Sequence, residues 1–371
     1  MFSRSQRRVA ASVVLALLVC TAVAQQPGAP SVPLAPLVSD AEGTLVGRAV
    51  DFGVSGLADG SVMRLTQRPA GLSAHTLYVA LPGKKTVRLN LRPISIRDAG
   101  YVLREQLADG SWRSVDAGPE STYTGTIAGE PGGYVAASWT VDGLLACVVF
   151  SDGQKQWIQP LSDYVPGADA ELHVAYRGDD TLCEGFCGNI DLPDSHPPAD
   201  GYGPRGTCGG AVCVAQLACD ADFEYFTARG SSSQATQDRI FAIINVMNHQ
   251  YVREVQIAHV ITTVLVRTAE PDPYSSNVSD TLMCQFITEW TDNQTGVTRD
   301  LAKLFTGRDI SGSTVGQASN FGQICDNAGF CTAGLDNGAY CYSQSDFSAT
   351  FACQTDVAAH QIGHLWGAHD C

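Results

Sequence analysis

Charged residues are scarce in this chain, and positive charge is the scarcer sign. Of 371 residues only 16% are charged, with 23 Lys and Arg against 38 Asp and Glu. An acidic surface repels nucleic acid and anionic membrane, so neither is an expected partner. The hydrophobic share of 44% indicates a globular protein rather than a disordered one, and the length suffices for two domains with a sizeable core.

Apolar runs long enough to cross a membrane are also absent from the sequence. The run from Val9 to Val19 falls short of the roughly 20 residues that a spanning helix needs. It follows three arginines and precedes the small residues of "AVA" at positions 22–24, which is the pattern of a secretory signal peptide. We therefore expect residues 1–24 to be cleaved. The mature protein is then secreted to the extracellular space, the periplasm or the cell surface, without stable membrane insertion.

Cleavage changes the balance of charges and cysteines. It removes Arg4, Arg7 and Arg8 from the 23 basic residues, which leaves 20 against 38 acidic residues and a formal charge of −18. The mature chain keeps 12 of the 13 cysteines, because Cys20 leaves with the signal peptide. Export places these cysteines in an oxidising compartment, so we expect most of them to form disulfides. Their spacing alone does not assign the pairs.

Strand-like text fills the first half of the mature chain. After a proline-rich leader at residues 25–39, short runs typical of strands alternate with turn signals such as "ADGS", "GEPGG" and "SDGQ" up to Leu161. This text predicts a β-rich, mostly antiparallel domain over residues 25–165. Residues 166–210 are rich in Gly, Pro and Asp and contain "CEGFC", and this composition predicts a linker.

Helical periodicity appears after the linker. "QDRIFAIINVMNHQYVREV" places Ile240, Ile244 and Met247 on one face of a helix, and "TLMCQFITEW" predicts a second helix. "AVCVAQLACDAD", before the first helix, reads as a strand, and "VITTVLVRT", between the two helices, reads as a buried strand. Alternating strands and helices predict a mixed sheet covered by helices over residues 211–371.

The last residues gather histidines at the spacing of metal ligands. In "HQIGHLWGAHD", His360 and His364 are four residues apart, so they lie on one face of a helix and can bind one metal ion. Gly367 then lets the helix end and the chain turn toward a third ligand. A ligand-type residue at the eleventh position, Asp370, completes the pattern.

This motif resembles the extended zinc motif of the metzincin metallopeptidases. "RDLAKLFTGRDISGSTVGQAS" is similar to the text that precedes it in the reprolysin (adamalysin, M12B) branch, and "STYTGTIAGEPGGYVAASWTV" resembles part of a reprolysin propeptide. The resemblance implies an α/β (α+β) metzincin-like catalytic domain with a mixed twisted sheet and long helices, preceded by a β-rich propeptide. It also implies Zn²⁺ as the cofactor and extended polypeptides as substrates. Their backbones would pair with an edge strand at Ser313, Thr314, Val315 and Gly316.

The chain departs from the family pattern at the third ligand. The family usually has histidine where Asp370 stands, and His369 lies one residue too early. One residue moves a Cα by about 3.8 Å, whereas zinc holds its ligands at about 2 Å. Aspartate is an accepted zinc ligand and ends the motif in some metzincins, so Asp370 is the first choice. A rebuilt turn that admits His369 is the alternative.

A second departure is Gln361, which occupies the position of the family's general-base glutamate. An amide has the same shape but no basic oxygen at neutral pH, so we expect zinc binding to survive and turnover to fall by roughly 10²- to 10⁴-fold. The Met-turn that follows the motif in the family is not part of this sequence, so the metallopeptidase domain is expected to be truncated after its zinc motif.

Cys208 in "PRGTCGG" is a candidate for holding such an enzyme latent. A propeptide cysteine upstream of the catalytic domain can bind zinc and occupy the water position. The text only loosely resembles such a switch, and an exported chain favours a disulfide at Cys208.

Three classes of function remain open from the sequence. The first is a secreted zinc metalloendopeptidase made as a zymogen, and the second is a zinc-binding pseudoprotease that holds extended peptides without cleaving them. The third is a metal-free, disulfide-braced extracellular module. Zinc content separates the third class from the other two, and hydrolysis of a denatured protein separates the first from the second. No signal in the sequence indicates the oligomeric state.

Overall fold

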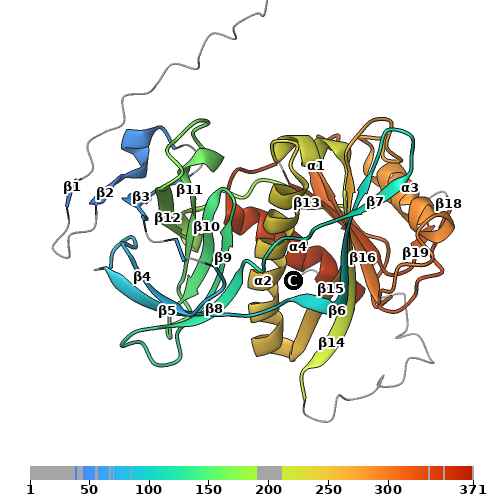
Figure 1. Ribbon diagram of the computed structural model, residues 1–371. Helices are drawn as coiled ribbons and strands as arrows, with labels where there is room; N and C mark the ends of the chain where they lie inside the picture. Colours follow the sequence, from blue (N-terminus) through green and yellow to red (C-terminus); the bar gives the residue numbers. More distant parts are fainter. Residues whose placement is uncertain are drawn as a thin grey trace, which may run out of the picture. The chain divides into compact units, whose positions relative to one another are not determined.

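The computed structural model describes residues 38–39, 45–54, 57–66, 68–69, 71–84, 86–189, 211–332, 335–345 and 347–369. Their strands form one antiparallel sheet of ten strands, one mixed sheet of eight and one small sheet of two (Figure 1). Below, the first two are called the antiparallel sheet and the mixed sheet. The predicted signal peptide lies outside the described residues.

The antiparallel sheet is built wholly from the N-terminal half of the chain, as the strand-like text predicts. Turns with glycine at positive φ, such as Gly143 and Gly153, connect neighbouring strands. In spatial order its strands are β1 (Val38–Ser39), β2 (Leu45–Arg48), β3 (Ser61–Arg64), β12 (Leu172–Arg177), β11 (Lys155–Pro160), β10 (Gly143–Val149), β9 (Tyr134–Thr140), β8 (Thr122–Ile127), β5 (Val87–Pro93) and β4 (His75–Val79).

The mixed sheet has parallel strands at its centre, which matches the alternation of strands and helices in the C-terminal half. Strand β17 runs antiparallel to β20 and lies close to one edge. In spatial order the strands are β13 (Phe186–Cys187), β17 (Thr314–Ala318), β20 (Tyr340–Gln344), β16 (Leu301–Thr306), β14 (Cys213–Ala221), β15 (Ile257–Arg267), β6 (Arg97–Gln106) and β7 (Trp112–Val115). The small sheet pairs β18 (Phe330–Thr332) with β19 (Leu335–Asn337).

The N-terminal region supplies strands to both edges of the mixed sheet, and this differs from the prediction of a separate β domain. The β6–β7 hairpin leaves the antiparallel sheet, and β6 pairs in parallel with β15 from Ile261 to Arg267. Strand β13 pairs in parallel with β17 at the opposite edge.

The predicted linker also needs correction. Residues Leu172–Arg177 form β12, because their apolar side chains are buried in the antiparallel sheet, and Phe186–Cys187 form β13. The rest of that segment, residues 190–210, lies outside the described residues.

Four α-helices lie in the described part of the chain: α1 (Phe223–Ala228), α2 (Ser233–Val255), α3 (Ser279–Asp292) and α4 (Phe351–Leu365). The predicted helices are confirmed as α2 and α3. Helix α2 begins where the Ser232 hydroxyl accepts a hydrogen bond from the Ala235 N–H, and it ends at Gln256 in the left-handed conformation. None of the helices in these ranges is long and apolar enough to cross a membrane.

Helix α2 is packed between the two large sheets (Figure 1). Every residue from 235 to 248 is buried, because one face contacts β9 and another contacts β15. Both sheets and α4 therefore share one hydrophobic core. The far face of the antiparallel sheet has its own core, and α3 covers the far face of the mixed sheet.

Candidate metal centre

Helix α4 brings His360 and His364 together, as their spacing predicts. Their imidazole centroids are 4.5 Å apart, and the two Nε2 atoms are 2.9 Å apart. The helix ends at Leu365, and Gly367 has a φ of +92°, a conformation that disfavours side chains. The glycine thus ends the helix where the motif requires a turn.

The turn after the helix fixes the orientation of His364. The Nδ1 atom of His364 lies 2.8 Å from the Ala368 carbonyl oxygen. A carbonyl can only accept, so Nδ1 donates in this contact, and Nε2 is the ring nitrogen that faces His360. This contact is the outer-shell hydrogen bond that metal-binding histidines usually make.

A third ligand-type atom at this point comes from β13. The Cys187 Sγ lies 3.2 Å from His364 Nε2, and the ligand atoms of Cys187, His360 and His364 all lie within 4.8 Å of one another. Three lone-pair-bearing atoms that face a common point are an arrangement suited to a cation. Another grouping in the described residues, Cys284, Cys331 and Asp336, contains a disulfide between its two cysteines and is not a comparable site.

Backbone pairing places Cys187 at the site. The Phe186 N–H donates to the Ser313 oxygen and the Gly188 N–H to the Gly316 oxygen, both at 2.7 Å. The Asn189 side chain then donates to the Ala318 oxygen at 2.7 Å and accepts from the Ala318 N–H at 2.8 Å.

The predicted substrate strand is therefore covered on its outer edge. Residues 314–316 lie in β17, and Ser313 directly precedes it. Strand β13 occupies the edge where the resemblance places a peptide substrate.

Gln361 lies beside the two histidines and is fully buried. Its Nε2 donates to the Cys187 Sγ at 3.4 Å. A Cβ at Gly316 would lie 3.0 Å from the Gln361 Cγ, so glycine lets β17 approach α4 closely. The side chain at the general-base position therefore faces the same point as the ligand atoms.

His369 lies against the same aromatic ring as His364, that of Phe321. Its ring stacks on Phe321 with centroids 4.6 Å apart, and it is not part of the Cys187, His360 and His364 group. Asp370 and Cys208 lie outside the described residues, so the third protein ligand and the role of Cys208 stay predictions.

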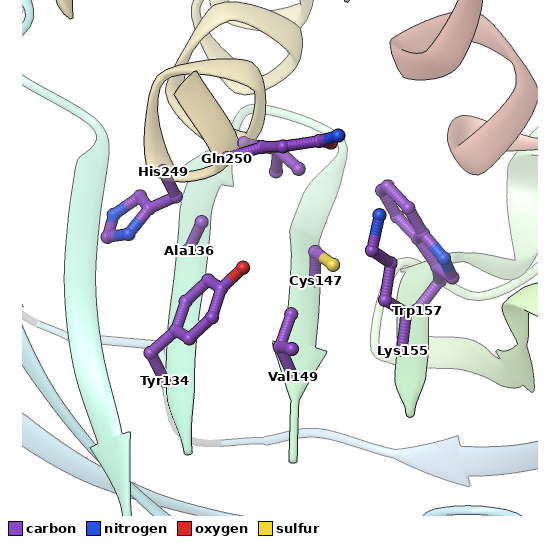
Figure 2. Close-up of a pocket in the computed structure, with 9 residues that line it drawn as sticks. Tyr134, Ala136, Cys147, Val149, Lys155, Trp157, His249 and Gln250 are labelled. Carbon is purple, nitrogen blue, oxygen red and sulfur yellow. The ribbon is translucent and has the colours of Figure 1, made fainter. Parts of the chain in front are cut away.

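A separate pocket lies between α2 and the antiparallel sheet. Figure 2 shows its lining, with His249 and Gln250 of α2 above the strands that carry Tyr134, Cys147 and Lys155. Burial raises the pKa of the Cys147 thiol to about 12, so it stays protonated and unreactive at neutral pH. The pocket does not contain the zinc motif.

Sequence reasoning missed Cys187 and the partner of Cys183. The structure pairs Cys183 with Cys353 in a disulfide and leaves Cys187 beside the histidines. The available signal was the pair of glycines that flank Phe186 and Cys187. A Cβ at Gly185 would lie 2.5 Å from Val315 Cγ1, and one at Gly188 would lie 2.9 Å from Thr314 Cγ2. Glycine at both positions marks close approach of one backbone to another.

Comparisons with known proteins agree with the geometry of the motif. Residues 213–371 match the family model Reprolysin_5, described as metallo-peptidase family M12. This part of the chain, which carries both histidines, is therefore similar to metallopeptidase family M12. No curated protein matches the chain.

Among solved structures, the chain is similar to the crystal structure of metalloproteinase-II from Bacteroides fragilis. The identity is 12% and the TM-score 0.42, with 81% of this chain and 83% of that chain covered. That similarity is too low to bear on the site.

Proposed function

We propose that this chain is the precursor of a secreted zinc-dependent metalloendopeptidase whose site is blocked by Cys187. The observation that carries the proposal is the grouping of the Cys187 thiol with the His360 and His364 imidazoles. The match to family M12 supports peptide-bond hydrolysis as the reaction. The disulfides Cys183–Cys353 and Cys284–Cys331 support an oxidising compartment.

The donor set fits zinc. Zinc binds thiolate sulfur at about 2.3 Å and imidazole nitrogen at about 2.0–2.1 Å, so two such nitrogens in a tetrahedral shell lie roughly 3.3 Å apart. The two Nε2 atoms are 2.9 Å apart, which is close to that separation. With Asp370 as the third protein ligand, or His369 as the alternative, Cys187 would complete four ligands. A four-ligand site is closed, and a catalytic site needs an open position.

Zinc bound there would supply a Lewis acid for hydrolysis of a peptide bond. In the unblocked protein, the free edge of β17 would hold an extended substrate by backbone pairing, as it holds β13 in the precursor. Gln361 can orient a group by hydrogen bonding but cannot take up a proton at neutral pH. The residues present therefore support substrate binding more fully than turnover.

Zinc stoichiometry tests the metal centre. We expect about one zinc per purified chain by elemental mass spectrometry, lost in His360→Ala and in His364→Ala. The matched control is His75→Ala, a histidine of β4 in the antiparallel sheet, which should keep the metal. An intact protein without stoichiometric zinc would support the metal-free module instead.

Restoring the carboxylate tests the catalytic role of position 361. In a Cys187→Ala background, which unblocks the site, Gln361→Glu should raise hydrolysis of a denatured protein by roughly two to four orders of magnitude over the parent. Gln361→Ala in the same background is the control and should not raise it. Equal rates for all three proteins would remove position 361 from the mechanism.

Gln361 also favours a second candidate function, a zinc-binding pseudoprotease that holds extended peptides. In that case the Cys187→Ala protein binds peptides at β17 with negligible hydrolysis. Peptide binding measured by fluorescence anisotropy, alongside the hydrolysis assay, distinguishes the two functions.

A further inference from the structure

A disulfide ties the segment that blocks the site to the helix that carries the histidines. Residues 183–189 are called the blocking segment below. Cys183 at its start bonds to Cys353, with the two Cα atoms 5.5 Å apart and 170 residues apart in sequence. Cys353 is buried in the first turn of α4, and His360 and His364 follow on the same helix.

The segment from Cys183 to Cys187 is just long enough to reach the histidines. Four residues of extended chain, from Cys183 to Cys187, reach at most about 13–14 Å. Along α4, the rise from Cys353 to Gln361 is about 12 Å and to His364 about 16 Å. The reach of the segment thus matches the distance along the helix. While the disulfide is intact, Cys187 stays within about 13–14 Å of Cys183, a range that includes the histidines.

Within the described residues, the far end of the blocking segment contacts the rest of the fold through noncovalent interactions. Beyond Cys187, these contacts are the backbone bond from Gly188 to Gly316 and the two hydrogen bonds between Asn189 and Ala318. A cut in the chain after residue 189 therefore frees one end of the segment and leaves the other end covalently attached, through Cys183 to α4 and through the chain to β12. A tethered group rebinds at a high effective concentration, so the site stays occupied.

We propose that cleavage of the peptide chain after the blocking segment does not unblock the site, and that release also requires reduction of Cys183–Cys353 by a dithiol. This inference rests on the proposed function, because it describes how the zinc site of that peptidase becomes accessible. The partner it implies is a dithiol reductant, either a small molecule or a thiol–disulfide oxidoreductase.

The reduction is an ordinary thiol–disulfide exchange. One thiolate of the dithiol attacks the Cys183 sulfur, which belongs to an exposed residue, and Cys353 leaves as a thiolate. The second thiol of the reductant then attacks the mixed disulfide, so Cys183 leaves and the reductant becomes a disulfide. Two electrons pass from the dithiol to the protein, and its two protons end on Cys183 and Cys353.

The test measures how fast Cys187 reacts with iodoacetamide in the zinc-loaded protein, by peptide mass spectrometry. A recognition sequence for a site-specific protease replaces residues 196–202, and each protein is assayed before and after the cut. In the otherwise unchanged chain we expect the cut to alter the rate by less than about twofold. In Cys183→Ser/Cys353→Ser the same cut should raise it roughly fourfold or more, since Cys187 is then tethered only through the chain that follows β12 at Arg177 and its effective concentration falls.

The matched control is Cys284→Ser/Cys331→Ser, which removes the disulfide between α3 and β18 and should behave like the unchanged chain. The cut control protein is also reduced with a phosphine, which is removed before alkylation, so the result does not depend on whether the serine variant folds. Reduction should raise the rate as the serine pair does. A cut that exposes Cys187 equally with and without the tether, or no rise on reduction, overturns the proposal.

The same samples separate this inference from the proposed function. Zinc is quantified in each, and the alkylation is repeated after chelation. Absence of zinc, or no effect of chelation in the uncut chain, contradicts the role of Cys187 as a ligand. The comparison of tethered and untethered cut chains still decides whether the disulfide retains the blocking segment.

Discussion

In the antiparallel sheet each strand pairs with a neighbour of opposite direction, whereas the centre of the mixed sheet is parallel. Titratable groups inside the antiparallel sheet are held neutral: burial lowers the pKa of His173 to about 4 and raises that of Cys147 to about 12. In the mixed sheet, ligand-type groups instead converge at one edge, next to β17. The antiparallel sheet therefore acts as a scaffold, whereas the mixed sheet carries the candidate metal centre.

The two sheets are nevertheless not two independent domains, because the N-terminal region supplies the β6–β7 hairpin and β13 to opposite edges of the mixed sheet. These two pairings differ in kind. Strand β6 is ten residues long and continues into the β7 hairpin, whereas β13 has two residues and runs beside the histidines. We infer that the pairing of β6 with β15 holds the N-terminal region firmly on the mixed sheet, and this pairing is called the anchor below. We infer that β13, called the cover below, can be displaced from β17.

The largest expected effect on stability comes from disrupting the contacts of Arg267, at the end of β15, which help hold the anchor. The Arg267 guanidinium is fully buried and binds both Asp220 oxygens, at 3.0 and 2.6 Å, and also donates to Gln106 of β6 at 2.9 Å. Arg267→Leu would leave buried carboxylates without their partner. We expect the free energy of unfolding to fall by about 3–5 kcal/mol in denaturant titration.

The control for this variant is Arg104→Leu. Both guanidinium groups lie over the Trp112 ring, that of Arg267 at 4.7 Å and that of Arg104 at 5.2 Å, but Arg104 is only partly buried. Arg104→Leu should lower the free energy of unfolding far less than Arg267→Leu does. Similar losses in the two variants would show that packing on Trp112, rather than the buried ion pair, holds the anchor.

Acid should weaken the antiparallel sheet through His173. Its Nε2 accepts from the Leu144 N–H at 2.8 Å and its Nδ1 faces the Glu171 oxygen at 3.0 Å, which fixes a neutral ring. Burial lowers its pKa from 6.5 to about 4, so below pH 6.5 the unfolded chain binds a proton that the folded chain does not. The stabilisation is complete above pH 6.5 and is lost as pH falls toward 4, by up to about 1.4 kcal/mol per pH unit.

His173→Gln removes this titration and keeps a hydrogen-bonding side chain. Unfolding free energies measured from pH 7 to 4 should therefore fall less steeply in the variant than in the parent chain. His259 of β15, whose pKa burial lowers to about 3, stays in both proteins and contributes equally. Parallel pH curves for variant and parent would exclude His173 as a source of the acid sensitivity.

The smallest expected effect is confined to β13. Gly185 has a φ of +146°, and a Cβ there would lie 2.5 Å from Val315 Cγ1. Gly185→Ala should therefore lift β13 from β17 and speed hydrogen exchange at the Phe186 and Gly188 amides roughly tenfold, while global stability changes little, because strain of this kind is worth about 1–3 kcal/mol locally.

Gly153→Ala is the control for backbone strain alone. Gly153 has a φ of +87° in a turn of the antiparallel sheet, and a Cβ there would meet nothing within 4 Å. Exchange at Phe186 and Gly188 should not change in this variant. Unchanged exchange in Gly185→Ala as well would mean that β13 tolerates the methyl group, and that the cover is held more firmly than we infer.

Local pattern predicted much of this structure. The helical spacing of Ile240, Ile244 and Met247 marks α2, and the spacing of His360 and His364 places both on one face of α4. Gly367 ends the helix as expected. These features depend on neighbours within a few residues of each other.

What the sequence did not reveal depends on partners far away in the chain. The sequence pattern of a β-strand does not indicate which strand it pairs with, so the pairing of β6 with β15 was not predictable. Cysteine spacing likewise leaves pairings open, and Cys183 meets a partner 170 residues away. Cys187 was missed because its role depends on that pairing and on the position of β17.

The burial of α2 on all sides has a consequence for how the protein folds. A helix exposed on one side can complete the core of a single domain, but α2 supplies apolar surface to β9 and to β15 at once. Neither sheet has a finished interior until the helix is in place between them. The order of synthesis strengthens this dependence on α2, since the N-terminal strands leave the ribosome long before Ser233 does. The antiparallel sheet stays incomplete on one face until this helix of the C-terminal half has been made, and the two halves acquire their stability together.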